Sequence, residues 1–232
     1  MKRISIALAA LLLALGTQAS AQTASPVASS TAVASVAPPP ADAHDLIERI
    51  LARNALLASY KARVHVNLRM LNFPFLAPVL AGTSYFKRPD NYEVVFDRVP
   101  GYAKGFEKIF NDVADPERWE VEQNVELRGT QVVDGHRYYV LYLTKKIHSD
   151  ILDHTLAFVD PSTYELARME WHYTSGGSIV MTQQYRTQGG YSFVAAQHVT
   201  IDIPHIHAVG ESQYGAYQTN VAVDDSVFSK KS

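Results

Sequence analysis

The chain has 232 residues, with 21 basic and 23 acidic side chains and a formal net charge of −2. Apolar residues make up 47% of it and charged residues 19%, which excludes a collagen-like chain, a coiled coil and a wholly disordered protein. The near-zero charge offers no basic surface for nucleic acid, and the absence of cysteine excludes disulfides, thiolate metal sites and lipidation on cysteine.

The N-terminus carries the pattern of a secretory signal peptide. Lys2 and Arg3 precede an apolar run at residues 4–15, which is too short to cross a bilayer as a helix, for which about 20 residues are needed. A small-residue site ending at Ala21 follows, so we expect residues 1–21 to be removed after Ala21 and the mature protein to reside in the periplasm. The alternative is an N-terminal membrane anchor.

Residues 22–43 are rich in Ala, Ser, Thr, Val and Pro, and they predict a flexible, partly extended tether. A single domain is expected at 44–232. It begins with an amphipathic helix at 44–58, where apolar residues recur at helical spacing. Asp45 and Glu48 resemble a capping box and place the start of this helix.

Residues 60–70 alternate between apolar and polar side chains, as in a half-buried antiparallel strand. Turn sequences such as Asp134-Gly135 separate the strands that follow, so hairpin after hairpin predicts one curved antiparallel sheet. The further strands are expected at 82–87, 92–97, 121–127, 136–145, 155–159, 166–173, 178–186, 193–203 and 211–221.

Two segments depart from the strand pattern. The segment from Leu71 to Leu80 holds two prolines among large apolar side chains, so it is either a rim that folds over the sheet or an exposed tip that contacts a membrane or a protein partner. Residues 104–113 place Phe106, Ile109 and Phe110 at the spacing of a short helix with one apolar stripe.

Several strands are apolar on both faces. Residues 136–145 carry Tyr138 and Tyr142 on one face, and Leu141 and Leu143 on the other. Two helices cannot cover both faces of a sheet this large. The expected fold class is therefore mainly β with helices (α+β): a curved antiparallel sheet that forms an unclosed half-barrel, covered by the N-terminal helix and a short lid helix. Its interior is expected to be an apolar cavity, unless its own side chains fill it.

The order of these motifs resembles that of the LolA-like periplasmic lipoprotein carriers. The resemblance covers residues 44–228 and is carried by GTSYFKRP at 82–89, VDGHRYYVL at 133–141, FVDPSTY at 158–164 and VDDSVF at 223–228. It implies a half-barrel with a helical lid and a cavity for acyl chains, in which Arg88 faces the cavity and holds the lid by hydrogen bonds. The longer segment at 98–120 and the longer, more apolar first hairpin indicate a relative rather than the carrier itself.

We therefore expect an exported soluble protein that holds the acyl chains of a lipoprotein or lipid, with no cofactor and no catalytic residues. The alternatives are an envelope sensor or assembly factor that binds a protein partner through its sheet, and a hydrolase. The candidate ligand-binding residues are Val64, Val66, Leu68, Phe86, Arg88, Tyr92, Val94, Phe96, Phe106, Ile109 and Phe110.

Histidines supply the remaining chemical signal. His205 and His207 alternate and could share a metal ion with His198, but their spacing shows no complete ligand set, so no metal is expected. His148 and His154 match no hydrolase motif.

Overall fold

The computed structural model describes residues 38–73, 75–99 and 116–229, and the fold is that of the unit Pro39–Ser232. The predicted signal peptide, most of the predicted tether and the predicted helix at 104–113 lie outside the described residues. Among the described helices, none has the length and apolar character needed to span a bilayer.

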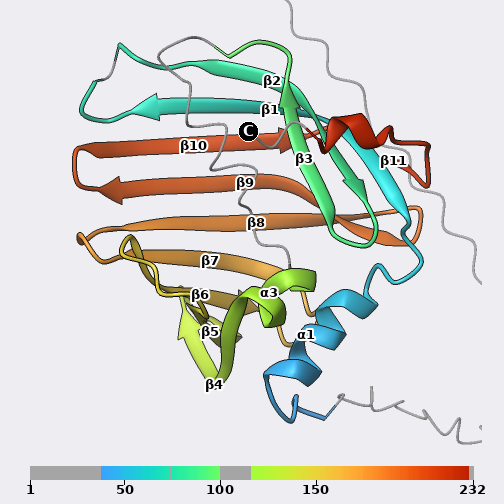
Figure 1. The fold of residues 1–232 in the computed structure, drawn as a ribbon, viewed down its shortest axis with the longest axis vertical. Helices are drawn as coiled ribbons and strands as arrows, with labels where there is room; N and C mark the ends of the chain where they lie inside the picture. Colours follow the sequence, from blue (N-terminus) through green and yellow to red (C-terminus); the bar gives the residue numbers. More distant parts are fainter. Residues whose placement is uncertain (1–37, 74, 100–115, 230–232) are drawn as a thin grey trace, which may run out of the picture. The chain divides into compact units, whose positions relative to one another are not determined.

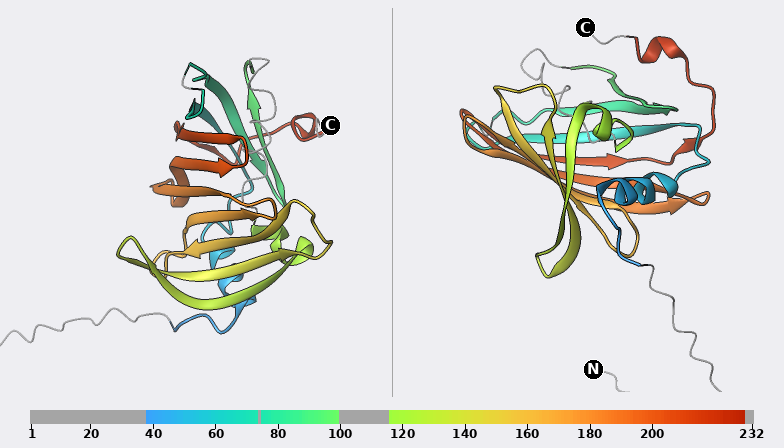
Figure 2. Two further views of the ribbon diagram at one scale, coloured as in Figure 1. Left: turned by 90° about the vertical axis from the view of Figure 1, so that its left-hand side faces the viewer. Right: turned by 60° about the horizontal axis from the view of Figure 1, so that its bottom comes forward.

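The described strands form one antiparallel sheet in the order β3-β2-β1-β10-β9-β8-β7-β6-β5-β4, with β11 paired to β1. The two edge strands turn toward the same side, so the sheet is curled but unclosed (Figures 1 and 2). The predicted half-barrel is confirmed. The strands are β1 (Ser59–Met70), β2 (Val79–Lys87), β3 (Asn91–Phe96), β4 (Gln123–Val133), β5 (His136–Lys145), β6 (Leu152–Val159), β7 (Leu166–Tyr173), β8 (Ser178–Gln188), β9 (Tyr191–Ile203), β10 (Ile206–Tyr214) and β11 (Gln218–Thr219).

Alternation along β1 sets which face is buried. Every second side chain from Ala62 to Met70 is buried, and Arg63, His65 and Arg69 between them are exposed. The predicted strand at 211–221 is wrong in extent, because the structure has two strands there, β10 and the short β11, with residues 215–217 between them.

Helix α1 (Ala43–Ala52) is shorter than the predicted 44–58 and starts earlier. Its N-cap is Asp42, whose carboxylate accepts a hydrogen bond from the backbone N–H of Asp45 at 2.9 Å, so the predicted capping box at Asp45 is wrong. Residues 53–56 form turns. Asn54 bonds the backbone of Ser192 with both ends of its amide instead of continuing the helix.

Helix α3 (Pro116–Glu122) was not expected, and it displaces the predicted start of a strand at Val121. Pro116 opens it and Glu117 lies in its first turn, which are favourable choices at a helix N-terminus. Trp119 anchors it and is 3% exposed. Both helices lie on the concave side of the sheet (Figures 1 and 2).

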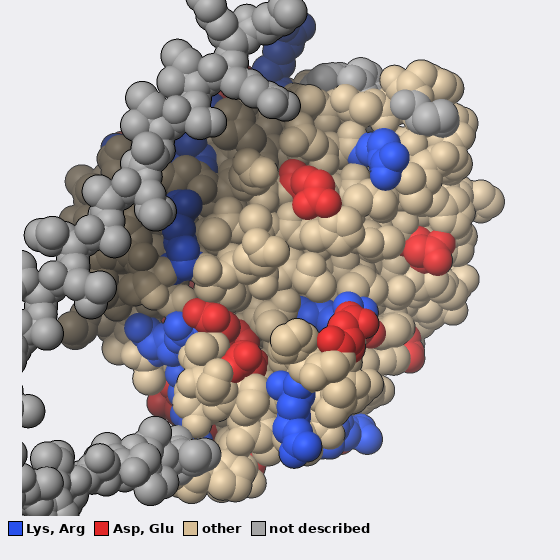
Figure 3. Space-filling view, turned by 180° about the vertical axis from the view of Figure 1, so that it is seen from behind, with Lys and Arg blue, Asp and Glu red and all other residues tan. Residues whose placement is uncertain are grey.

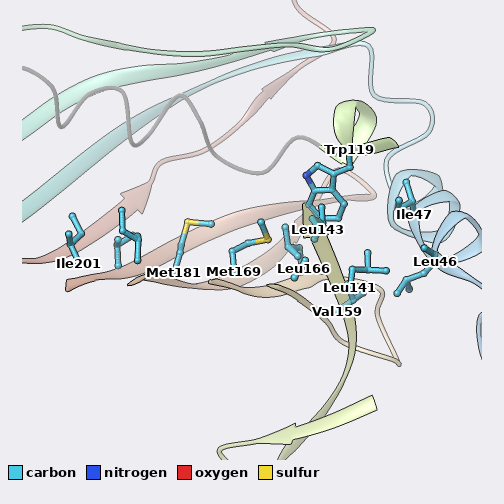
Figure 4. Close-up of a cluster of buried hydrophobic side chains, with 14 of the residues drawn as sticks. Leu46, Ile47, Trp119, Leu141, Leu143, Val159, Leu166, Met169, Met181 and Ile201 are labelled. Carbon is cyan, nitrogen blue, oxygen red and sulfur yellow. The ribbon is translucent and has the colours of Figure 1, made fainter. Parts of the chain in front are cut away.

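The apolar interior consists of two clusters on the concave side. One lies beneath α1 and α3, where Leu46, Ile47 and Trp119 pack with side chains from β5 to β9 (Figure 4). The other joins the first hairpin to β9 and to residues near the C-terminus. Its buried members include Val64, Val66, Leu80, Val94, Phe193, Tyr214 and Tyr217.

The convex face explains why some strands are apolar on both sides. Phe158 points away from the inner cluster that holds Ala157 and Val159, yet it is 1% exposed. The ring of Tyr138 packs edge-on against the Phe158 ring, with ring centres 6.2 Å apart, and the guanidinium of Arg168 lies 5.9 Å from the centre of the Phe158 ring. Flanking side chains thus cover Phe158 on this face. Figure 3 shows this side of the molecule, where uncharged residues form most of the surface and charged residues lie singly or in small groups.

Candidate ligand-binding site

A cavity of about 240 Å³ lies on the concave side, between the end of α1, the first hairpin and strands β8 to β10. The turn after α1 brings Asn54 and Leu57 to it, and α3 contributes Pro116 and Glu117. The strands contribute aromatic and amide side chains because their inward positions in this region are Tyr, Phe and Gln.

Stacked aromatic rings form one wall of the cavity. Phe193 and Tyr217 stack with ring centres 4.1 Å apart, and Tyr60 packs edge-on against both. Tyr60 also stacks on Phe86 at 5.5 Å. Aromatic rings packed in this way bury large apolar areas in few conformations, so the wall presents a preformed apolar surface.

Burial raises the pKa of five tyrosines at the cavity. Loss of solvent is the largest cause for each phenol, because a phenolate would be poorly solvated there. The tyrosines are Tyr60, Tyr92, Tyr185, Tyr214 and Tyr217. The cavity is therefore a low-polarity environment even though hydroxyl groups line it.

Arg88 fastens the segment that follows α1. Its Nε donates to the carbonyl of Leu57 at 2.7 Å and its Nη2 to the carbonyl of Asn54 at 3.0 Å. Its Nη1 donates to Glu117 Oε1 at 3.2 Å, which links the turn to α3. The lid-holding role that the LolA-like resemblance implies for this arginine stays a prediction.

A second ion pair lies at the same end of the cavity. Arg53 Nη2 donates to Glu165 Oε1 at 2.8 Å, and the Ser192 hydroxyl donates to the same oxygen at 2.8 Å. Together with Arg88 and Glu117, the charged residues that line the cavity number two of each sign. The lining thus carries no net charge.

The predicted binding residues are divided between the cavity and the packed clusters. Phe86, Arg88 and Tyr92 line the cavity. The others in the described part of the chain lie in the buried clusters instead, and their role in binding stays a prediction; they are Val64, Val66, Leu68, Val94 and Phe96. Phe106, Ile109 and Phe110 lie outside the described residues.

Sequence reasoning missed the polar members of the lining. Gln183 and Tyr185 continue the inward row of Ile179 and Met181 on β8, and Gln197 continues that of Val199 on β9. A glutamine at an inward position of an otherwise apolar strand face is the signal that could have identified them.

The segment from Leu71 to Leu80 is a tip at the other end of β1. Leu71, Phe73, Phe75 and Val79 are exposed by 48%, 46%, 80% and 67%. Leu80 is buried. None of the described residues of this segment lines the cavity, so of the two interpretations the exposed tip agrees with the structure.

Four of the candidate histidines each pair with a single carboxylate: His148, His154, His198 and His207. His207 Nδ1 lies 2.7 Å from Asp202 Oδ1, and His198 lies against Glu211. Across the described ranges, no group of three or more His, Asp or Glu side chains is arranged to hold a metal ion. His154 stacks between Tyr142 and His172.

No family model matches the chain, and no curated protein matches it. Among solved structures, a LolA superfamily protein from Nitrosomonas europaea superimposes with a TM-score of 0.62 at 14% identity, over 82% of this chain and 98% of that one. The fold is LolA-like. An outer membrane lipoprotein-sorting protein domain from Vibrio parahaemolyticus gives 0.60 at 11% identity, over 79% and 96% of the two chains. A DUF1329 family protein from Desulfovibrio piger gives 0.63 at 14% identity, over 81% and 95%.

At these identities the comparisons establish the LolA-like fold and no more. The three matches each cover about four fifths of the chain. What the LolA-like fold does in this chain has to be argued from its cavity.

Proposed function

We propose that the protein is an exported carrier that holds an acyl chain of a lipoprotein or lipid in its cavity. The observation that carries this proposal is the cavity of about 240 Å³ under the end of α1, with an aromatic wall and no net charge in its lining. Ligand sites commonly have volumes of roughly 300–1,000 Å³, so this cavity suits one chain, or part of one, better than several.

Binding would be driven by burial of the chain. Each methylene that leaves water for an apolar environment contributes about 0.8 kcal/mol. The stacked rings of Tyr60, Phe193 and Tyr217 are already ordered, so little further ordering would oppose binding. The proposal requires no cofactor and no catalytic group.

Export to the periplasm is part of the proposal. It is supported by the signal-peptide pattern at residues 1–21.

The first test is to look for the ligand. The protein is expressed with its own N-terminus, purified from the bacterial envelope and extracted with organic solvent, and the extract is examined by mass spectrometry. We expect acyl-containing species at a stoichiometry near one per protein. A protein that carries no such species and does not bind the neutral fluorophore N-phenyl-1-naphthylamine would rule the proposal out.

A variant that fills the cavity with a larger side chain gives a second test of the carrier proposal. Ile50 lines the cavity from α1, so Ile50→Trp is expected to occupy the space and to abolish fluorophore binding while the fold is kept. Leu56→Trp is the control, because Leu56 is 85% exposed and is not part of the lining. Equal fluorophore binding by both variants would place the bound molecule elsewhere.

A second candidate is an envelope sensor or assembly factor that binds a protein partner. The exposed tip favours it, because four large apolar side chains stand in water on one hairpin. Cross-linking in cells through a photoreactive residue at position 75 tests this candidate. One reproducible protein adduct, with no acyl species in the purified protein, would favour it over the carrier.

A further inference from the structure

Three polar side chains lie next to one another on the inner face of the sheet. Gln183 on β8 is the register partner of Gln197 on β9, and Gln197 is the partner of Ser212 on β10. We call these three residues the polar row. Both glutamines line the cavity. Gln197 is 3% exposed and Ser212 is 1% exposed, so the row is an interruption of a buried apolar face.

The carbonyl oxygens of both amides are already occupied. Gln197 Oε1 accepts a hydrogen bond from the Tyr214 hydroxyl at 2.9 Å. Gln183 Oε1 accepts one from the Tyr185 hydroxyl at 2.7 Å. The tyrosines therefore hold each amide with its NH₂ group as the end that is left to interact.

Those NH₂ groups converge on a weak acceptor. Gln197 Nε2 lies 3.5 Å from the sulfur of Met181, and Gln183 Nε2 lies 3.9 Å from the same sulfur. Met181 belongs to the row of side chains on the concave side that Figure 4 shows. A thioether is a poor hydrogen-bond acceptor compared with an oxygen.

Ser212 adds another hydrogen-bonding group without a partner. Its Oγ is buried and has no hydrogen-bond partner within the part of the chain that the structure describes. Buried donors that lack a good acceptor are unfavourable, and an acceptor oxygen from a ligand would relieve that cost. Ser212 itself does not line the cavity, so the donors of the polar row that a ligand oxygen can reach from the cavity are the NH₂ groups of Gln197 and Gln183.

The charges at the cavity favour a neutral ligand. Arg53 lies 2.8 Å from Glu165 and Arg88 lies 3.2 Å from Glu117, so each arginine already has a carboxylate. Burial also raises the pKa of Tyr185 and Tyr214 beside the row, which reflects surroundings that disfavour a negative charge.

We propose that the polar row binds the carbonyl or hydroxyl oxygen of a neutral single-chain amphiphile, such as an acyl ester, amide or alcohol. The chain would lie against the aromatic wall and the oxygen would accept from Gln197 and Gln183. This inference rests on the proposed function, because it assumes that the cavity holds the chain. It adds that the cavity selects its ligand by a hydrogen bond to an oxygen atom as well as by burial of the hydrocarbon chain.

The test measures displacement of N-phenyl-1-naphthylamine from the purified mature protein by methyl octanoate, octanoate and octane. In Gln197→Leu, the affinity for methyl octanoate is expected to fall about tenfold relative to that for octane, because the variant keeps the apolar contacts and removes the donor. The matched control is Gln184→Leu on the exposed side of β8, which should leave both affinities unchanged.

The outcomes separate the two proposals. If neither the fluorophore nor any of the three ligands binds, the carrier function itself fails. If the ligands bind but Gln197→Leu lowers the affinities for ester and octane equally, or not at all, the polar row has no recognition role. Tighter binding of octanoate than of methyl octanoate would overturn the inference that the cavity selects a neutral ligand. If circular dichroism shows that Gln197→Leu does not fold, Gln183→Leu carries the same comparison.

Discussion

Arg88 shows how one side chain can fix the position of a whole segment. Its guanidinium donates to two backbone carbonyls and to Glu117, so the turn after α1 and helix α3 depend on the same group. A planar guanidinium can serve three acceptors at fixed angles, whereas an ammonium on a flexible stem cannot.

Arg88→Lys is therefore expected to lower the free energy of unfolding by about 1–2 kcal/mol, through lost hydrogen bonds to carbonyl oxygens. Urea denaturation measures this change in the free energy of unfolding. The control is Arg63→Lys, since Arg63 pairs with Asp97 on the exposed face, where both side chains are about half exposed and an ion pair contributes about 0–1 kcal/mol. Equal losses in the two variants would mean that Arg88 acts only as a surface charge.

The buried tyrosines predict a loss of stability in alkali. Their pKa values are raised in the folded protein, so their contribution is fully present below the unfolded value of about 10 and is lost as the pH rises above it. Each tyrosine that is ionised only in the unfolded chain lowers the free energy of unfolding by about 1.4 kcal/mol per pH unit.

Denaturation midpoints measured from about pH 8 to about pH 11 should fall steeply at the alkaline end, and tyrosinate absorbance should appear together with unfolding. Tyr185→Phe should make the fall less steep. Tyr142→Phe, on the convex face, is the control. A midpoint that does not change over this range would show that these phenols ionise in the folded protein as they do in the unfolded chain.

The alternation of apolar and polar residues predicted which side of the sheet each side chain faces, but it did not predict where the cavity lies. The inward direction of Val64, Val66 and Leu68 follows from a two-residue period, and all three are buried. The location of the cavity does not follow from it, because that depends on where α1 ends and which part of the inner face it leaves uncovered. Arg88 was identified only through the family resemblance.

At the scale of elements, helix ends depend on side chains that periodicity does not detect. The apolar repeat continues from Leu46 to Leu57, but the helix stops at Ala52 because Asn54 bonds Ser192, which is distant in sequence. Helix α3 has seven residues, too few for a repeat to be recognised. The strands, in contrast, were predicted well because hairpins pair neighbours in sequence.

The observed N-cap gives a direct test at this scale. Asp42→Ala is expected to lower the free energy of unfolding by about 1 kcal/mol, because the N–H of Asp45 loses its acceptor. Asp42→Asn is the control and should change little, since an asparagine side chain caps nearly as well. Thermal denaturation of the three proteins measures this. A full loss in Asp42→Asn would point to the charge rather than the cap.

At the scale of the molecule, β1 joins two regions with different surroundings. Its first residues, with Tyr60, belong to the cavity, and its last residue leads into the exposed tip. At about 3.3 Å per residue, Tyr60 and Leu71 are about 36 Å apart along the strand. Ligand binding and contact with an outside surface can therefore be separated by substitution.

Phe75→Ser is expected to leave both stability and ligand affinity unchanged, because Phe75 is 80% exposed and lies far from the cavity. Surface changes of this kind usually alter stability by no more than about 0.5 kcal/mol. Its effect should appear instead in co-sedimentation with vesicles of phosphatidylethanolamine and phosphatidylglycerol, which an exposed aromatic tip promotes and a serine does not.

Val132→Ser is the matched control, since Val132 is 58% exposed on β4, at the opposite edge of the sheet from the first hairpin. Loss of vesicle binding in Phe75→Ser alone would assign membrane contact to the tip. Unchanged vesicle binding in both variants would contradict membrane contact by the tip. A protein partner that covers the tip would then be the one to look for, because four exposed apolar side chains on one hairpin are unfavourable in water.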